Sequence, residues 1–512
     1  CLLQMYCNSY SKRRNVLLKV TTCFVVLRLS TTFSLQTLIT VGHEKEKRAQ
    51  YSSASSRRSS PSLSLNSCPR AWIVPEGVSF GSLDNLKFEE IPGYETNNNS
   101  YLSDQDCGNE NDSNKLLVQV STKAIGLNFA DIFCVLGLYS AANAVRGKTA
   151  ESAFCPGLEF AGVVHVDPTN TFKKGDRVLG FRRFGAYSDI VSAPPAFLYP
   201  LPSNWTYLQG ASFLVQALTA WHGLVQIGGM PIIVNQQERQ QKKYVVLIHS
   251  AAGGVGLWAS EIAARRGATV IGVIGNVEKS KIFNERILPL SPLSRTIIRG
   301  DEKTFGARLA ELLLDVHKEA DNGDSSEDKG NYHNSNLQSL REGGYGVDLV
   351  MESLGGKYFS ESFESLNSGG AVVTFGSTSY VSPGLGLGRL RLFWRYVTRP
   401  FVDPGTLTSR NVRIGGFNLI YLTENREELR RQLCDCIHCL SGSSSTDITA
   451  TTAKNSAANE NLPSLEDVSP PVIGRVFDFR TETIEALEYL KSGKSIGKVV
   501  LDNGNNNLDL DV

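Results

Sequence analysis

The stretch from Tyr244 to Lys281 constrains the fold most, because it predicts a strand, a glycine turn, a helix and a second strand without interruption. Its first strand is rich in β-branched and aromatic residues, and Gly253, Gly254 and Gly256 follow directly. Such glycines let the chain turn sharply and let a pyrophosphate approach the backbone. Apolar residues then recur at helical spacing, and the amides and dipole at the start of that helix would face the phosphates. The stretch therefore predicts a dinucleotide-binding unit.

Composition limits the class of protein. The chain has 512 residues, of which 41% are hydrophobic, and a formal net charge of +1. This length allows two or three domains with buried cores. A near-neutral balance gives no electrostatic reason to expect a nucleic-acid partner. The ten cysteines have no disulfide-framework spacing, which favours a reducing compartment for the folded part.

Residues 1–66 differ in composition from the rest of the chain. They are rich in Ser, Thr, Lys and Arg, and their only acids are Glu44 and Glu46. The apolar run Val16 to Leu29 is interrupted by polar and basic residues, so it is too short and too polar for a span of about 20 apolar residues. We expect a targeting or disordered segment and an organellar location, in a plastid or mitochondrion, with a cytoplasmic location as the alternative.

The distribution of strand and helix patterns predicts a chain that is mainly β before the glycine turn and α/β around it. Strand-like runs occur at Lys115 to Ser121, Leu158 to Val166 and Arg177 to Phe181, and a helical stretch at Gln209 to Val225. After the turn, helical and strand patterns alternate, and a last strand is expected at Lys498 to Leu501. This arrangement is typical of a β-rich domain combined with a parallel α/β sheet.

Several separate motifs occur in the order in which one enzyme superfamily carries them. They are AIGLNFADIFCVLGLY (Ala124 to Tyr139), PGLEFAGVV (Pro156 to Val164), KKGDRV (Lys173 to Val178), the AAGGVG loop, DLVMESLGG (Asp348 to Gly356), GGFNLIYL (Gly415 to Leu422) and GKVVL (Gly497 to Leu501). With these motifs the chain resembles the medium-chain dehydrogenase/reductase superfamily, in its zinc-independent quinone oxidoreductase branch. The GGFNLIYL stretch is most similar to the vesicle amine transport protein homologues.

The resemblance implies an α/β fold in which a GroES-like β-rich catalytic domain carries an inserted, doubly wound Rossmann domain. It also implies a cleft between the two domains and a homodimer. The expected layout is a targeting or disordered segment at 1–66, the first part of the catalytic domain at 67–215, the Rossmann domain at 216–402 with a disordered insertion near 318–345, the return to the catalytic domain at 403–502 with a disordered insertion near 441–470, and a polar tail at 503–512.

The residues after the second strand of the α/β unit indicate which dinucleotide binds. Folds that prefer NAD place an acid about 20 residues beyond the glycine loop, where it binds the ribose hydroxyls. Here the strand ends near Asn276, and Lys279 follows. A lysine suits a 2′-phosphate, and the matching lysine of the resembling family serves NADPH. We expect NADPH, bound by Asn276, Lys279 and the loop residues Ala252, Gly253, Gly254, Val255 and Gly256.

Two alternatives for this cofactor assignment stay open. In the first alternative, Lys279 and Lys281 are solvated charges on a loop. In the second alternative, Glu278 is the acid that allows NAD to bind. Two departures from the usual pattern also stand in the sequence: Ala251 replaces the first glycine of the fingerprint, and Arg299 stands where family members often have a tyrosine. Arg299 is a second candidate partner for the phosphate.

The residues at the catalytic-metal positions of zinc-dependent relatives argue against a metal. Those enzymes use Cys and His ligands to hold zinc as a Lewis acid. By resemblance, Asn128 stands where they carry a cysteine, and Leu158 where they carry a histidine. The one cluster, Cys434 to Cys439 with His438, matches no standard site and is typical of an amphipathic helix. We therefore expect no metal site.

Without zinc, hydride transfer needs position and a polar environment for the developing negative charge. The resemblance places Asn128 and Tyr139 beside the nicotinamide, where they would hold the substrate oxygen or the carboxamide, and Tyr139 would be a candidate proton donor. The alternative is that Tyr139 is a packed aromatic residue whose hydroxyl caps a loop. The resemblance also places Thr219, Phe375 and Gly376 near the nicotinamide.

These observations predict an NADPH-dependent, zinc-free oxidoreductase that reduces quinones or α,β-unsaturated carbonyl compounds by hydride transfer. The alternative is a dinucleotide-binding scaffold with weak catalysis that works at a membrane surface or in vesicle or lipid transport. The basic aromatic stretch Gly384 to Pro400 is typical of a helix that lies on an anionic membrane. The stretch can equally line the substrate cleft or a subunit interface, and partly buried packing is favoured over contact with lipid.

Overall fold

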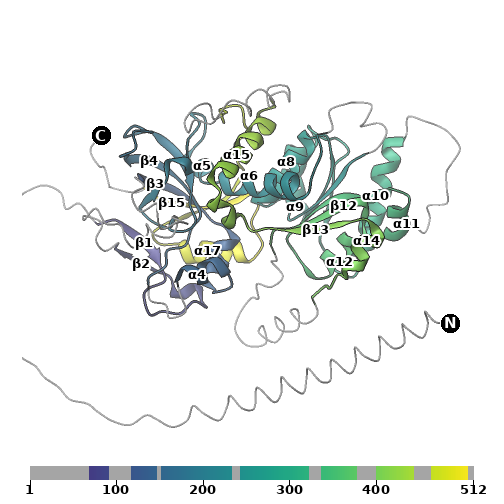
Figure 1. Ribbon diagram of the computed structural model, residues 1–512, viewed down its shortest axis with the longest axis horizontal. Helices are drawn as coiled ribbons and strands as arrows, with labels where there is room; N and C mark the ends of the chain where they lie inside the picture. The colour runs from purple at the N-terminus through teal and green to yellow at the C-terminus, as the bar shows by residue number, and fades with distance from the viewer. Residues whose placement is uncertain are drawn as a thin grey trace, which may run out of the picture. The chain divides into compact units, whose positions relative to one another are not determined.

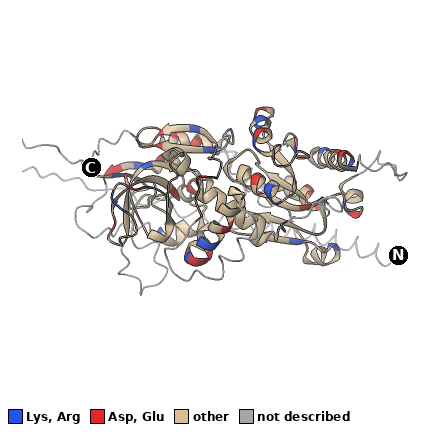
Figure 2. Ribbon diagram, turned by 90° about the horizontal axis from the view of Figure 1, so that it is seen from above, with Lys and Arg blue, Asp and Glu red and all other residues tan. Residues whose placement is uncertain are grey.

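The computed structural model describes residues 68–90, 117–146, 152–232, 243–321, 336–376, 399–442 and 463–504. The chain divides into two units, Cys1–Leu65 and Asn66–Val512, and all described residues belong to the second. Several predicted features lie outside the described residues: the targeting segment, the basic stretch up to residue 398 and the polar tail from residue 505. Figure 2 shows that Lys and Arg are interspersed with Asp and Glu over the described elements.

The first sheet combines strands from both ends of the folded unit (Figure 1). Its order is β14-β15-β3-β4-β5-β7, and β6 also pairs with β3. The C-terminal strand β15 runs antiparallel to β3, with Val500 opposite Gly126, so the chain returns to the domain in which it began. The strands are β3 (Val118–Gly126), β4 (Glu159–Val166), β5 (Arg177–Phe181), β6 (Ile190–Ala193), β7 (Leu198–Pro200), β14 (Ile473–Asp478) and β15 (Lys498–Asp502).

Smaller elements border this sheet. β1 and β2 form an antiparallel pair, and α3 and α4 follow β3 in the chain. Among the described residues no single helix is long and apolar enough to cross a membrane, and one bent pair, α3 with α4, meets the criterion by length and composition only. The bounds are β1 (Arg70–Ile73), β2 (Lys87–Glu90), α3 (Phe129–Val135), α4 (Ser140–Arg146) and α17 (Thr483–Lys491).

The second sheet has six strands in the order β10-β9-β8-β11-β12-β13. All neighbouring strands are parallel. This is the doubly wound Rossmann order, in which the first strand lies beside both the second and the fourth. The expected fold class is therefore confirmed. The strands are β8 (Val245–His249), β9 (Thr269–Ile274), β10 (Arg295–Ile298), β11 (Val347–Glu352), β12 (Leu366–Thr374) and β13 (Arg413–Gly416).

Helices cover both faces of the Rossmann sheet because its strands are apolar on both sides. Val246 and Ile248 of β8 pack in one core cluster with α6, α8 and α15, whereas Val245 and Leu247 pack in another with α10, α11 and α12. Successive strand residues point to opposite faces, so each face has its own core. The helices are α6 (Leu214–Trp221), α8 (Gly254–Arg265), α9 (Val277–Ile287), α10 (Phe305–Asp321), α11 (Leu337–Glu342), α12 (Gly356–Glu364), α14 (Pro404–Arg410) and α15 (Arg426–Ser441).

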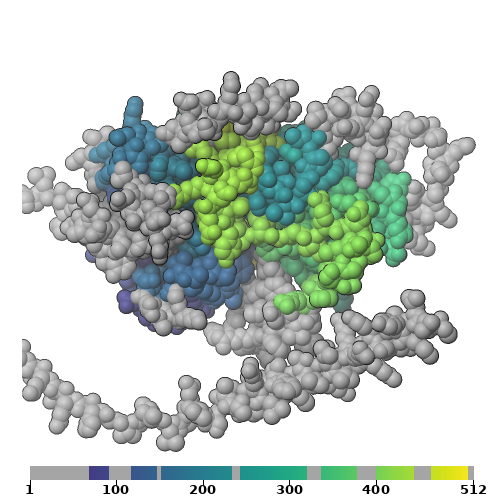
Figure 3. Space-filling model, viewed as in Figure 1, coloured from purple at the N-terminus to yellow at the C-terminus, as the bar shows by residue number. Residues whose placement is uncertain are grey.

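The helices α6 and α15 join the two sheets. Their core cluster also contains Leu179 and Phe181 of β5, so one continuous apolar core spans both sheets. Figure 3 shows the segment from β13 through α15, in yellow-green, on the face between the blue and teal parts of the molecule. The helix predicted at 209–225 is divided in the structure into α5 (Tyr207–Gly210), α6 and a π-helical turn, His222–Ile227.

Several predicted limits differ from the structure. β13 pairs with β12 in the Rossmann sheet, although it lies beyond residue 402, where that domain was expected to end. The insertion predicted near 318–345 includes the end of α10 and all of α11, whose Leu337 and Leu340 are buried. The end of the insertion predicted near 441–470 buries Leu465 and Val468. Average polarity hides such isolated apolar residues, which anchor the edges of a polar segment to the core. The remaining domain limits stay predictions.

Candidate active site

The glycine turn after β8 is held in a conformation that only small residues allow. Ser250 has a positive φ of 54°, and α8 begins one residue after its N-cap, Gly253, with no side chain capping it. A Cβ on Gly256 would lie 2.2 Å from the Ser250 carbonyl oxygen, so the third glycine allows the close approach of helix and strand. The Gly497 amide donates to the Ala252 carbonyl at 2.8 Å, which ties the turn to the start of β15.

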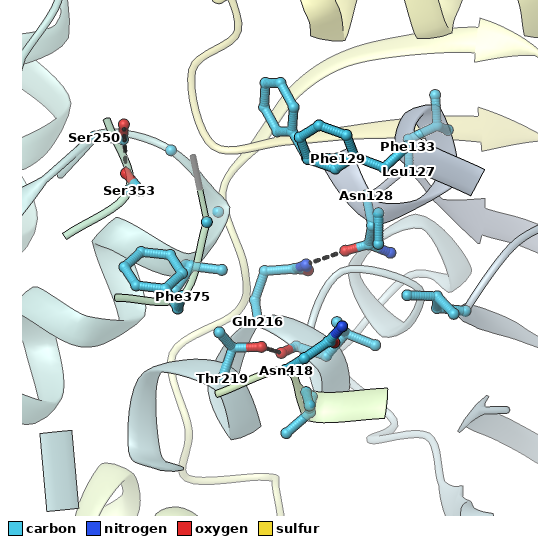
Figure 4. A pocket seen from close by; sticks show the side chains of 18 of the residues that line it. Leu127, Asn128, Phe129, Phe133, Gln216, Thr219, Ser250, Ser353, Phe375 and Asn418 are labelled. Carbon is cyan, nitrogen blue, oxygen red and sulfur yellow. Dashed lines mark hydrogen bonds between the residues drawn. The ribbon is translucent and has the colours of Figure 1, made fainter. Parts of the chain in front are cut away.

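A cavity of about 580 Å³ lies beside this turn. It brings together most of the predicted site residues, although they come from distant parts of the chain. Figure 4 shows Asn128, Gln216, Thr219, Phe375 and Asn418 around this pocket. The predicted residues that line it are Asn128, Tyr139, Thr219, Gly253, Gly254, Val255, Gly256, Phe375 and Gly376. Ala252 is buried beside the cavity without lining it.

The side chain of Asn128 is the centre of a buried polar network. Its Oδ1 accepts hydrogen bonds from Gln216 Nε2 at 2.6 Å and from Lys498 Nζ at 3.0 Å. Its Nδ2 donates to the Gly126 carbonyl at 3.2 Å and to Glu159 Oε1 at 3.1 Å. An amide side chain has two donor hydrogens and two acceptor lone pairs, and all four are used. The predicted contact of Asn128 with a substrate oxygen would require one of these bonds to break.

A buried ion pair completes this network. Lys498 Nζ donates to Glu159 Oε1, and the two side chains are 4% and 1% exposed. Glu159 Oε2 accepts the Val215 amide at 3.2 Å. Burial holds the pKa of Lys498 below its ordinary value, against the opposing charge of Glu159. The network therefore joins α3, β4, α6 and β15 at the wall of the cavity.

Tyr139 lies at another wall and is tied to the segment after β13. Its hydroxyl donates to Asn418 Oδ1 at 2.6 Å, and its ring packs edge-on against Phe184. Burial raises the pKa of Tyr139 above its ordinary value, which makes its proton harder to release. Thr219 donates its own hydroxyl to the Val215 carbonyl at 2.6 Å, so that hydrogen is also used within the protein.

A buried carboxyl lies behind the Asn128 wall. Asp131 Oδ2 accepts the Asn128 amide at 2.8 Å and the Tyr187 hydroxyl at 3.0 Å. Burial raises the pKa of Asp131 to about 7. Asp131 therefore holds the backbone at Asn128, as the third residue of a capping box does.

Asn276 and Lys279 lie at the carboxyl end of β9, and neither lines the cavity. Asn276 caps α9 by accepting the Lys279 amide at 3.1 Å. Lys279 is buried in the first turn of α9 and donates Nζ to the Gly493 carbonyl at 2.9 Å. Burial first, and the charge of Arg299 second, hold the pKa of Lys279 below its ordinary value. The alternative of a solvated loop charge is therefore wrong for Lys279, whereas the Lys281 side chain is 80% exposed.

Some residues of the cavity were not singled out from the sequence. Gln216, Lys498 and Asn418 line it, and Glu159 supports it from behind. Lys498 lies within the GKVVL motif and Asn418 within the GGFNLIYL motif, so these two motifs could have indicated both residues as site candidates. Gln216 lies in a predicted helix whose sequence has no such signal.

The turn has the geometry that a dinucleotide pyrophosphate requires. The uncapped first turn of α8 supplies backbone amides, and helix N-termini bind phosphate through such amides. A side chain larger than glycine would crowd the turn, because a Cβ on Gly253 would lie 3.2 Å from the Ser250 carbonyl oxygen. Gly253, Gly254, Val255 and Gly256 would therefore hold the pyrophosphate.

The positions of zinc ligands in related folds hold other groups here. Asn128 uses its amide within the protein, and Leu158 presents an alkyl side chain to the cavity. The cysteines at 434, 436 and 439 lie on α15, which is amphipathic as predicted, and Cys436 is buried against the Ala217 carbonyl. Within the described ranges, no three His, Cys, Asp or Glu side chains group closely enough to hold a metal ion.

Comparisons with known proteins agree with this architecture. The family model of the alcohol dehydrogenase GroES-like domain matches residues 114–203. Quinone oxidoreductase of Mus musculus is 28% identical over 267 residues, which are 52% of this chain and 65% of that protein. Synaptic vesicle membrane protein VAT-1 homolog of Rattus norvegicus is 26% identical over 320 residues, which are 61% of this chain and 65% of that protein. The matched part spans just under two thirds of either relative.

A solved structure extends the likeness in fold to both sheets. The structure of a mycobacterial protein complexed with NADPH matches 85% of this chain and 99% of its own, with a TM-score of 0.55 and 21% identity. The doubly wound sheet, the strand that returns from the C-terminus, and these relatives lead to one assignment. In sequence and fold the chain is similar to the medium-chain dehydrogenase/reductase superfamily, in the branch of quinone oxidoreductases and VAT-1-like proteins.

Proposed function

We propose that this protein is an NADPH-dependent, zinc-free oxidoreductase that reduces quinones or α,β-unsaturated carbonyl compounds by hydride transfer. One observation carries the proposal: the glycine turn and Tyr139, Thr219 and Phe375 line a single cavity. The turn would hold the pyrophosphate, so the nicotinamide would lie in that cavity with the substrate. The proposal also draws on the names of the mouse quinone oxidoreductase and the mycobacterial NADPH complex.

Two cations support NADPH over NADH. Lys279 is buried, and this burial together with repulsion from the nearby Arg299 charge holds the pKa of Lys279 below its ordinary value. A 2′-phosphate at this end of β9 would relieve that repulsion and gain charge-assisted hydrogen bonds. NAD-preferring folds place an acid at the end of the second strand, where it binds the ribose hydroxyls. Here Gly275 and Asn276 directly follow that strand instead.

The cavity wall suits an apolar substrate. NADPH, when bound, would supply a hydride to a substrate carbon. Aromatic and aliphatic side chains would hold that carbon in a dry environment, where hydrogen bonds to a developing negative charge are strong. The apolar side chains that line the cavity include Phe129, Phe133, Leu138, Phe181, Phe417, Leu419 and Ile420.

Polar groups of the chain would act without a metal. Asn128 and Leu158 stand at the ligand positions of zinc enzymes, and neither residue type is a usual zinc ligand. The network of Asn128 with Gln216 and Lys498 fixes the wall beside the turn. Charge on the substrate oxygen would therefore be stabilised by hydrogen bonds from the protein.

Steady-state NADPH oxidation tests this proposal. The purified protein would be assayed with 1,4-naphthoquinone and 2-cyclohexenone, with NADPH or NADH as the donor, and cofactor affinity would be measured in parallel by fluorescence titration. We expect turnover with at least one substrate and a preference for NADPH. Tight NADPH binding without turnover would instead favour the scaffold. The homodimer, the membrane contact through Gly384 to Pro400 and the organellar location stay predictions.

A further inference from the structure

Three of the polar side chains in the cavity have already used their hydrogens within the protein. Asn128 donates both amide hydrogens to Gly126 and Glu159. Thr219 donates its hydroxyl to a backbone carbonyl. Tyr139 donates its hydroxyl to Asn418. A substrate carbonyl oxygen, which can only accept hydrogen bonds, therefore needs a donor other than these three.

Asn418 offers such a donor, and its orientation is determined by the backbone. Its side-chain oxygen accepts the Ile420 amide at 3.4 Å and the Tyr139 hydroxyl at 2.6 Å. A backbone N–H can only donate, so this long contact assigns Oδ1 to the atom that faces Ile420. The other end of the side chain, Nδ2, has no hydrogen-bond partner among the residues that the structure describes, and Asn418 lines the cavity (Figure 4).

We propose that Asn418 Nδ2 donates a hydrogen bond to the carbonyl oxygen of the substrate, and that Tyr139 positions Asn418. This inference rests on the proposed reductase function and deepens it. As the substrate β-carbon takes the hydride, the electron pair of its C=C bond shifts and the carbonyl oxygen becomes an enolate oxygen. The α-carbon then takes a proton from water, and NADPH is oxidised to NADP⁺. Asn418 stabilises the charge on the oxygen during the first step.

Tyr139 is a positioning residue in this scheme. Its one hydroxyl hydrogen lies on Asn418 Oδ1, and burial makes its ionisation unfavourable. Its effect on the reaction passes through the orientation of the Asn418 amide. Removal of the hydroxyl should therefore matter only while the Asn418 amide is present.

Four variants and a control separate these roles. Asn418→Asp keeps an oxygen for Tyr139 and Ile420 but removes the N–H donor, whereas Asn418→Ala removes the whole amide. Tyr139→Phe removes the orienting hydroxyl, and the double variant combines it with Asn418→Ala. The control is Tyr421→Phe, because Tyr421 lies in the same turn, does not line the cavity, and has its hydroxyl 2.9 Å from Ser140 Oγ. The substitution keeps the backbone bond from the Tyr421 amide to the Asn418 carbonyl.

We expect Asn418→Asp and Asn418→Ala to lower kcat for 2-cyclohexenone by about 100- to 1000-fold, as loss of one oxyanion donor does. The NADPH affinity of these variants should stay within about twofold of the wild-type value. Tyr139→Phe should lower kcat by a smaller factor. The double variant should be no slower than Asn418→Ala alone, since coupled residues are not additive. Tyr421→Phe should match the wild type.

Two results would overturn the inference alone. One is Asn418→Asp and Asn418→Ala with wild-type turnover, which would assign the donor to another group such as Lys498. The other is a double variant whose loss equals the product of the two single losses. A wild-type protein that binds NADPH and reduces none of the substrates would contradict the proposed function itself, and this inference with it.

Discussion

The buried pair of Glu159 and Lys498 makes the loss of either partner costly. Both side chains are almost fully buried, at 1% and 4% exposed. Glu159→Gln would leave the Lys498 ammonium without a counter-charge, and breaking a buried pair in this way costs about 3–5 kcal/mol. Lys498→Met would leave the carboxylate alone at a similar cost. Glu159→Gln with Lys498→Met should cost clearly less than the sum, because no isolated charge remains.

Thermal unfolding measures this directly. At roughly 2 °C per kcal/mol for a large domain, each single variant should lower Tm by about 6–10 °C. Glu285→Gln is the matched control, because its pair with Lys281 is exposed on both sides and such pairs contribute little. A Glu159→Gln variant as stable as the control would refute the reasoning. So would a double variant that loses as much as both single variants together.

Three further predictions concern the cofactor and the buried acid. Lys279→Ala should lower kcat/KM for NADPH by about 10- to 100-fold and leave that for NADH nearly unchanged; equal losses would remove the phosphate role. Gly256→Ala would place a Cβ 2.2 Å from the Ser250 carbonyl oxygen and should weaken NADPH binding and lower Tm, as overpacking by about 1–3 kcal/mol does; unchanged binding would contradict the tight turn. Asp131 has its pKa raised from 3.8 to about 7, so the folded state holds a proton that the unfolded state releases between these values. The stability of the wild type relative to Asp131→Asn should therefore fall as pH rises from about 4 to 7 and level off above; a constant difference, measured by urea unfolding across this range, would exclude that shift.

The fold was largely predictable because its signals are local. The glycine turn, the apolar strand β8 and the helix after it are contiguous in the sequence, and strand alternation and glycine geometry act over a few residues. The return of β15 to the first sheet is not a local signal. The resemblance to the superfamily implied it, and the pairing of Val500 with Gly126 confirms it.

The edges of polar segments were the least predictable part of the fold. Leu337 and Leu465 are single apolar residues beside long polar runs, and the composition of the run outweighs them. Both are nevertheless buried. Burial of one side chain is decided by the core that it meets, which a window of sequence does not contain.

The residues that line the cavity were predictable in part, but their hydrogen bonds were not. Resemblance selected Asn128 and Tyr139, and both line the cavity. The partners that use up their hydrogens lie 31 residues away for Asn128 with Glu159 and 279 residues away for Tyr139 with Asn418. No spacing rule connects positions so far apart, so the polar contacts appear only in the folded chain.

The transfer of deuterium tests the central claim most directly. NADPH labelled with deuterium at the transferred position of the nicotinamide would be incubated with the protein and 2-cyclohexenone, and the product analysed by mass spectrometry. We expect cyclohexanone that carries one deuterium at the β-carbon, together with NADP⁺ in equal amount. Unlabelled product, or labelled NADPH recovered intact from a tight complex, would contradict it.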